Sequence, residues 1–173
     1  MAILNVEFKA KTNRLQEAEE KLRRFDAHFA GQDNQTDTYF NVPQGRLKLR
    51  EGNIENALIY YERPDHAGEK ISDTLLYRCN PDVNLKAILI KSLGIKIVVS
   101  KKRRIYYVGN VKIHFDRIES LGEFIEVEAC DNNGEFAIGV LRNQCAQFRD
   151  LFEVTEDDLV PFSYSDLLLR SGF

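Results

Sequence analysis

Five stretches of this chain alternate charged and apolar residues with a period of two, and this pattern constrains the fold more than any other feature. The stretches lie at residues 6–11, 46–50, 97–103, 111–116 and 125–128. A period of two places the charged side chains on one face of a β-strand and the apolar ones on the other. One such strand is typical of a sheet with one face in water. Five of them, carrying acids and bases together, also fit a barrel with charged faces inside and apolar faces under helices.

The charged faces of these strands are candidates for binding a polyphosphate with its metal ions. Lys and Arg neutralise phosphate oxygens, and carboxylates bind hard divalent cations. The candidate residues are Glu7, Lys9, Lys11, Arg46, Lys48, Arg50, Lys101, Arg103, Lys112, His114, Asp116, Glu126 and Glu128. Lys102 and Arg104 alternate onto the opposite face, so we expect both at the surface. The alternative for every member of the set is an ordinary solvated face.

Composition narrows the partners and the compartment. A chain of 173 residues fits one domain, here expected over residues 1–173. A net charge of −3 gives no basic field for nucleic acid or an anionic membrane. Three well-separated cysteines (Cys79, Cys130 and Cys145) predict free thiols. We find no signal-peptide pattern and no apolar run near the roughly 20 residues that span a bilayer. We therefore expect a cytoplasmic protein.

The order of predicted elements indicates an α+β fold with a mostly antiparallel sheet. Strands are expected at 2–11, 36–42, 46–51, 57–63, 72–78, 95–108, 111–117 and 122–130. Helices are expected from Thr12 to about Gly31, from Asn80 to Gly94, from about 134 to 149 and from about 165 to 170. The mid-chain turns, such as Gly109-Asn110, are too short for parallel crossovers. About eight strands could close into a barrel.

The strand motifs resemble those of CYTH proteins, the triphosphate tunnel metalloenzymes. NVEFKAK stands at the place of the N-terminal ExExK signature of that family. QTDTYFNVPQGRLKLRE, LIYYERPDHAGEKISD, VVSKKRRIYY and VKIHFDRIESLGEFIEVEA are similar to the later blocks, in the same order. DTYFNVP and LGEFIEVE are most similar to the class IV adenylyl cyclase-like branch. The resemblance implies a closed barrel of eight antiparallel strands with flanking helices around a charged tunnel.

The resemblance also implies a role for each candidate residue. Mg²⁺ or Mn²⁺ would be the cofactor, held by Glu7, Glu126, Glu128, Asp116 and Asn5. Asn5 stands where the signature has its first Glu, and it offers a carbonyl oxygen without a charge. The catalytic cations would be Lys9, Lys48, Arg50, Lys101 and Arg103. Substrate binding would add Lys11, Arg46, Arg63, Lys70, Lys112 and His114.

Three functions remain open from the sequence. A class IV adenylyl cyclase-like enzyme would convert ATP into cyclic AMP and pyrophosphate. A triphosphatase would hydrolyse tripolyphosphate, thiamine triphosphate or a nucleoside triphosphate with nearly the same tunnel residues. A non-catalytic module would bind a triphosphate or nucleotide only, and Asn5 is the feature that favours it. The expected partner in each case is a small-molecule triphosphate (ATP or tripolyphosphate), and a homodimer is possible.

Overall fold

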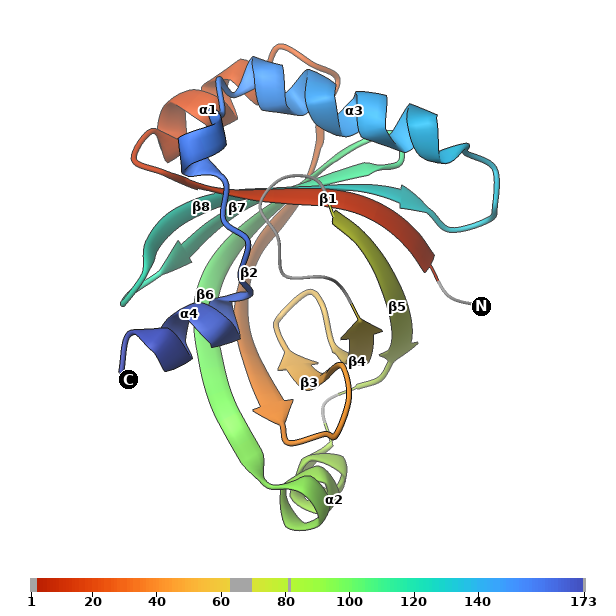
Figure 1. Ribbon diagram of the computed structural model, residues 1–173, viewed down its shortest axis with the longest axis vertical. Helices are drawn as coiled ribbons and strands as arrows, with labels where there is room; N and C mark the ends of the chain where they lie inside the picture. The colour runs from red at the N-terminus through yellow and green to blue at the C-terminus, as the bar shows by residue number, and fades with distance from the viewer. Residues whose placement is uncertain (1–2, 63–69, 81, 173) are drawn as a thin grey trace.

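The computed structural model describes residues 3–62, 70–80 and 82–172, with the side chains of Ile3 and residues 70–73 left out (Figure 1). The strands in this part of the chain are β1 (Ile3–Thr12), β2 (His28–Phe40), β3 (Arg46–Glu51), β4 (Ala57–Glu62), β5 (Lys70–Arg78), β6 (Ile95–Val108), β7 (Val111–Ile118) and β8 (Gly122–Asp131). The α-helices are α1 (Leu15–Leu22), α2 (Val83–Leu93), α3 (Ile138–Leu151) and α4 (Tyr164–Arg170), and a 3₁₀ turn covers Glu156–Asp158. The predicted antiparallel α+β architecture with eight strands and flanking helices is confirmed.

The strands follow one another around a lumen. Their order is β1-β5-β4-β3-β2-β6-β7-β8, and every neighbouring pair is antiparallel. β1 joins the two ends of this order. It pairs with β8 from Leu4 to Thr12 but with β5 only from Ile3 to Glu7. The order thus closes on itself as a barrel, and the strand faces that point inward are those with the charged residues.

The apolar faces of β1, β7 and β8 point outward and lie under α1 and α3, as the alternation predicted (Figure 1). The main core forms between these faces and the helices. Its buried members include Val6, Phe8, Leu22, Ile113, Phe115, Val127, Leu141 and Phe148. Burying one such side chain stabilises the fold by roughly 1.5–3 kcal/mol. The core between the helices and the outer faces of β1, β7 and β8 therefore fixes these strands, and with them the charged side chains on their inner faces.

The predicted first helix is wrong in its second half. α1 ends at Leu22, and the residues that extend the helical spacing, Phe25 and Phe29, lie elsewhere. The Phe25 ring packs 6.0 Å from Phe148 of α3, and Phe29 lies in β2, 4.7 Å from the Tyr106 ring. β2 begins at His28 because β6 offers it a partner along almost its whole length, from Tyr107 to Ile95. This long-range pairing outweighs the local helical spacing.

The third helix also begins later than predicted, at Ile138 rather than about residue 134. The carboxylate of Asp131 accepts hydrogen bonds from the backbone N–H groups of Asn133 and Glu135, at 3.4 and 2.9 Å. These bonds hold a turn after β8 and delay the helix. None of the described helices is long and apolar enough to cross a membrane.

Candidate functional site

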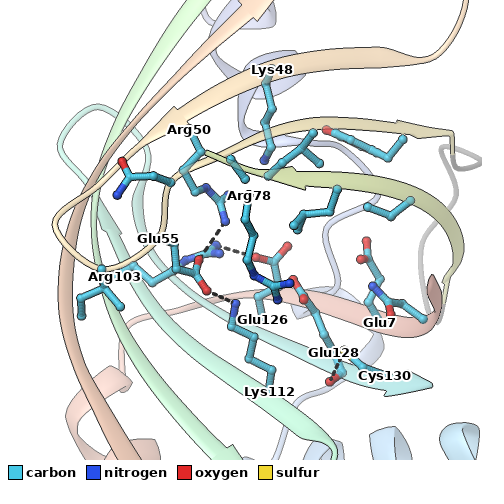
Figure 2. A pocket seen from close by; sticks show the side chains of 18 of the residues that line it. Glu7, Lys48, Arg50, Glu55, Arg78, Arg103, Lys112, Glu126, Glu128 and Cys130 are labelled. Carbon is cyan, nitrogen blue, oxygen red and sulfur yellow. Dashed lines mark hydrogen bonds and ion pairs between the residues drawn. The ribbon is translucent and has the colours of Figure 1, made fainter. Parts of the chain in front are cut away.

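The inward faces of the strands enclose a cavity of about 750 Å³ (Figure 2). This volume is within the range of small-molecule sites. Ten of the predicted site residues line it, namely Asn5, Glu7, Lys9, Lys48, Arg50, Lys101, Arg103, Lys112, Glu126 and Glu128. The alternating pattern therefore brings the predicted acids and bases into one space.

The start of α4 lines one end of the cavity through Ser163 and Tyr164. A capping box formed by Ser163 and Asp166 fixes the first turn of this helix. Tyr164 follows, and its hydroxyl donates a hydrogen bond to Asp116 at 2.7 Å while the Nζ atom of Lys9 lies 3.9 Å from the centre of its ring. Arg46 pairs with Asp166 at 2.9 Å at this same end. A helix near the C-terminus, far in sequence from β1 and β3, thus shapes the site.

The opposite end of the cavity is lined by the loop between β3 and β4 and by the ends of β5 and β8. Glu55 lies in this loop, and Lys112 approaches from β7. Figure 2 shows Arg78 of β5 pointing into the cavity toward Glu128. This end therefore brings further charged groups to the cavity.

One wall of the cavity gathers cations around a single buried carboxylate, Asp37 of β2. Asp37 accepts ion pairs from Lys48 at 3.0 Å, Arg50 at 2.9 Å and Lys101 at 2.7 Å. Burial alone would raise the pKa of Asp37, but the charges of Arg50, Lys101 and Lys48 outweigh burial and hold this pKa well below its ordinary value. We call Asp37, Lys48, Arg50 and Lys101 the cation wall.

The cation wall has more positive charge than Asp37 can balance. Burial lowers the pKa of Lys101 to about 7, and repulsion from Arg50, Arg103 and Lys48 acts in the same direction. The ion pair with Asp37 opposes this shift and does not cancel it. A polyanion bound here would supply the missing negative charge.

The facing wall gathers carboxylates on β1 and β8. Glu7 pairs in register with Glu128, and Lys9 pairs with Glu126. Burial, together with the charges of Glu126 and Glu7, raises the pKa of Glu128 to about 7. Next to them, the buried Oδ1 atom of Asn5 has no hydrogen-bond partner among the described residues. We call Asn5, Glu7, Glu126 and Glu128 the acid wall.

The acid wall fits a hard divalent cation. It crowds like charges together and leaves a buried carbonyl oxygen without a donor, and a cation with oxygen ligands would relieve both costs. Donor atoms of His114, Glu126 and Glu128 lie within 4.8 Å of one another. Burial, with repulsion from Arg103 and Lys112, lowers the pKa of His114 to about 3, so its ring is neutral. His114 is therefore able to offer a nitrogen lone pair to the same ion.

Asp116 has a different place from the one expected of a metal ligand. Arg103 donates to both of its oxygens, at 2.7 and 2.6 Å, and the Tyr164 hydroxyl binds one of them. Arg103 also reaches Glu126 at 2.6 Å. Asp116 thus orients Arg103 between the two walls. It lies outside the cavity lining and outside the donor group of His114, Glu126 and Glu128, so we remove it from the expected metal ligands.

Besides Asp116, five other expected site residues are not among the described residues that line the cavity. His114 is fully buried and does not border it. Lys11 is exposed and borders a separate outer hollow beside Arg14 and Glu153. Arg46 is held by Asp166 at the start of α4. Arg63 lies outside the described residues, and Lys70 is described only by its backbone, at the start of β5. Lys102 and Arg104 lie on the outer face as predicted, and Arg104 pairs there with Glu19.

Several residues of the site were missed from the sequence. Asp37, Glu55, Arg78 and Tyr164 all line the cavity or bind its charged groups. Asp37 lies in a stretch with polar residues on both faces, GQDNQTD, where no period of two is visible. Glu55 and Tyr164 lie outside the alternating strands, so a search by alternation could not find them.

Comparison with known proteins agrees with this geometry. The family model described as the CYTH domain matches residues 4–161. A search of curated proteins gave no match. Among solved structures, a Pyrococcus horikoshii protein is 24% identical with a TM-score of 0.80, and the alignment covers 94% of this chain and 98% of that one.

Two further solved structures have names that refer to an activity. A Vibrio parahaemolyticus protein named "putative adenylate cyclase" is 19% identical, with a TM-score of 0.79 and coverage of 96% of this chain and 98% of that one. A Hippeastrum "putative adenylyl cyclase", described as having a dominant triphosphatase activity, is 12% identical, with a TM-score of 0.64 and coverage of 99% and 96%. At these identities the likeness is one of fold. The match of the family model over most of the chain shows that this protein belongs to the CYTH domain family.

Proposed function

We propose that this protein is a divalent-metal-dependent enzyme that binds a triphosphate in the cavity and forms cyclic AMP and pyrophosphate from ATP. The observation that carries the proposal is the pair of opposed walls. One has three cations around Asp37, and the other has three carboxylates and the unpartnered oxygen of Asn5. A triphosphate with a bound cation has the charges that complement both walls.

The protein groups would act by position and charge. Lys48, Arg50 and Lys101 would hold the phosphate oxygens, and Arg103 would face the reacting phosphorus because Asp116 and Glu126 fix its guanidinium. Asn5, Glu7, Glu126 and Glu128, with His114 beside them, would hold Mg²⁺ or Mn²⁺. When bound, the ion would supply positive charge to the phosphate oxygens. No protein nucleophile is needed for this chemistry, because the substrate's own hydroxyl or water attacks.

In the cyclase reaction the ribose 3′-oxygen forms a bond to the α-phosphorus, the bond from the α-phosphorus to the bridging oxygen breaks, and pyrophosphate leaves. The hydroxyl proton passes to solvent or to a nearby base. A nucleoside beside the phosphates needs an apolar surface. Ala57, Ile59 and Leu76 line the cavity from β4 and β5, between β3 of the cation wall and β1 of the acid wall. This apolar side favours an organic triphosphate over an inorganic one.

Phosphorus NMR of the purified protein tests the proposal directly. Samples would contain Mg²⁺ or Mn²⁺ and either ATP or tripolyphosphate. We expect cyclic AMP and pyrophosphate from ATP. Orthophosphate released mainly from tripolyphosphate would contradict the cyclase and establish the triphosphatase. If the protein binds these compounds but converts neither ATP nor tripolyphosphate, both the cyclase and the triphosphatase hypotheses are contradicted.

A neighbouring pair of lysines supplies the matched control for this experiment. Lys101 faces the cavity and Lys102 faces outward on the same strand. Lys101→Met should abolish most of the turnover, and Lys102→Met should leave it unchanged. Equal loss in both variants would mean that the reaction does not occur in the cavity.

A further inference from the structure

Glu55 holds a carboxylate at the end of the row of cations in the cavity. The row begins with Lys48 beside Tyr39 and continues to Arg50 beside Asp37. Beyond Arg50 comes Glu55, which accepts from the Nη1 atom of Arg50 at 3.1 Å and pairs with Lys112 of β7 (Figure 2). Gln35 donates to the same carboxylate at 3.0 Å. Glu55 thus joins the β3 and β7 sides of the cavity.

A second buried carboxylate fixes the loop that carries Glu55. Asp33 of β2 is fully buried, and it accepts from the backbone N–H groups of Asn53, Ile54 and Glu55 at 2.7, 3.0 and 2.9 Å. Gly52 is needed for this approach, because a Cβ atom there would lie 2.5 Å from an oxygen of Asp33. The loop backbone is therefore held against β2, and Glu55 is not on a loose segment.

The pKa of Glu55 agrees with a permanent charge at this position. Burial would raise this pKa, but Lys112 and Arg50 outweigh burial and lower it far below the ordinary value. Glu55 is therefore ionised at any pH at which the protein would work. Its negative charge occupies the place where a further phosphate would meet Arg50 and Lys112.

We infer that Glu55 is a specificity-determining residue that ends the phosphate row and limits the length of the phosphate chain the cavity accepts. Asp33 is the positioning residue that acts through the loop. This inference rests on the proposed triphosphate site and adds its upper size limit. The phosphate groups of a triphosphate would pair with the row of cations that ends at Arg50. A fourth phosphate would lie a few ångströms from the fixed negative charge of Glu55 and be repelled by it.

The test compares two phosphate chains on three proteins. Isothermal titration would measure the dissociation constants of tripolyphosphate and tetrapolyphosphate in EDTA, where metal-dependent turnover is avoided. The proteins are the wild type, Glu55→Gln and Glu123→Gln. Glu123 is the matched control because it also pairs with a cation, Arg117 at 2.8 Å, but on the outer surface. Circular dichroism would check that each variant is folded.

The wild type should bind tripolyphosphate more tightly than tetrapolyphosphate. Glu55→Gln should shift the ratio of the two constants toward tetrapolyphosphate by about tenfold, because it removes a like charge from a partly buried site. Asp33→Asn should shift the ratio in the same direction by a smaller factor, although Glu55 is still present. Glu123→Gln should leave the ratio unchanged.

Two outcomes would overturn the inference. If the wild type binds tripolyphosphate and tetrapolyphosphate equally tightly, the cavity sets no limit on phosphate length. The wild type alone is enough to show this. If the wild type prefers tripolyphosphate but folded Glu55→Gln keeps the same ratio, Glu55 does not set the limit, while the triphosphate site itself stands. If the wild type binds tripolyphosphate neither in EDTA nor with Mg²⁺, the proposed function and the inference are overturned together.

Discussion

The two walls of the cavity are electrostatic opposites, and each has one group that its own neighbours shift toward neutrality. On the cation wall, burial and the nearby cations lower the pKa of Lys101 to about 7. On the acid wall, burial and the nearby carboxylates raise the pKa of Glu128 to about 7. At these two groups, burial and like charges thus outweigh the counter-charges within each wall. An anion beside one wall and a cation beside the other would complete both.

The walls differ in how their internal counter-ions are placed. Asp37 gives the cation wall a fully buried carboxylate shared by three cations. On the acid wall, Lys9 at 3.2 Å and Arg103 at 2.6 Å pair with Glu126, while burial and the charges of Glu126 and Glu7 raise the pKa of Glu128. The comparison teaches that Asp37 organises the cations of one wall, whereas on the other wall an added cation would favour the charged form of Glu128. Substitutions on the two walls should therefore have different consequences.

The largest expected effect is on stability, from Asp37→Asn. It leaves Lys48, Arg50 and Lys101 buried without their shared carboxylate, so the free energy of unfolding should fall by about 3–5 kcal/mol. Urea denaturation would measure the change, and exposed Asp150→Asn on α3 is the control. Tripolyphosphate should restore part of the loss. A loss of stability below about 1 kcal/mol would contradict the role given to Asp37.

The next effect is on activity, from Lys101→Met. Turnover of the triphosphate substrate should fall by about 10²–10³-fold, because one charge that holds the phosphates is gone. The ligand-free protein should not lose stability, since a buried cation with a lowered pKa is replaced by an apolar side chain of similar length. Steady-state kinetics and thermal melts together check this. A parallel loss of activity and stability would indicate a structural role.

A smaller effect should follow from Asn5→Glu on the acid wall. It adds the carboxylate that the family signature has at this place, so Mn²⁺ should bind about tenfold more tightly. Electron paramagnetic resonance of free Mn²⁺ would measure the affinity, with exposed Asn13→Glu as the control. If activity also rises strongly, the missing carboxylate limits the native protein. An unchanged affinity would place the metal away from Asn5.

The smallest effect should come from Lys102→Ala, one residue from the cation wall but on the outer face. The free energy of unfolding should change by no more than about 0.5 kcal/mol, and turnover should remain at the wild-type level. Denaturation and kinetics check both. A large loss of activity here would break the distinction between inner and outer faces on which the comparison depends.

The sequence predicts the inner face of β1, β3, β6, β7 and β8 because their alternation with a period of two is directly visible. It does not predict the organising residues of that face. Asp37 and Asp33 lie on β2, where polar residues occupy both faces of the strand. The family resemblance implies that Asp116 is a metal ligand. No local pattern reveals its hydrogen bond to Tyr164, which comes 48 residues later. The family resemblance supplies the barrel, whereas these charge pairings need the three-dimensional contacts.

The most direct test of the two-wall account is proton uptake on tripolyphosphate binding at pH 8. With its pKa lowered to about 7, Lys101 is mostly neutral at this pH, and a bound polyanion should raise that pKa and draw a proton onto the amine. Titration calorimetry in buffers of different ionisation enthalpy counts the protons. We predict an uptake approaching one proton in the wild type and its loss in Lys101→Met. Binding without proton uptake in the wild type would contradict the account.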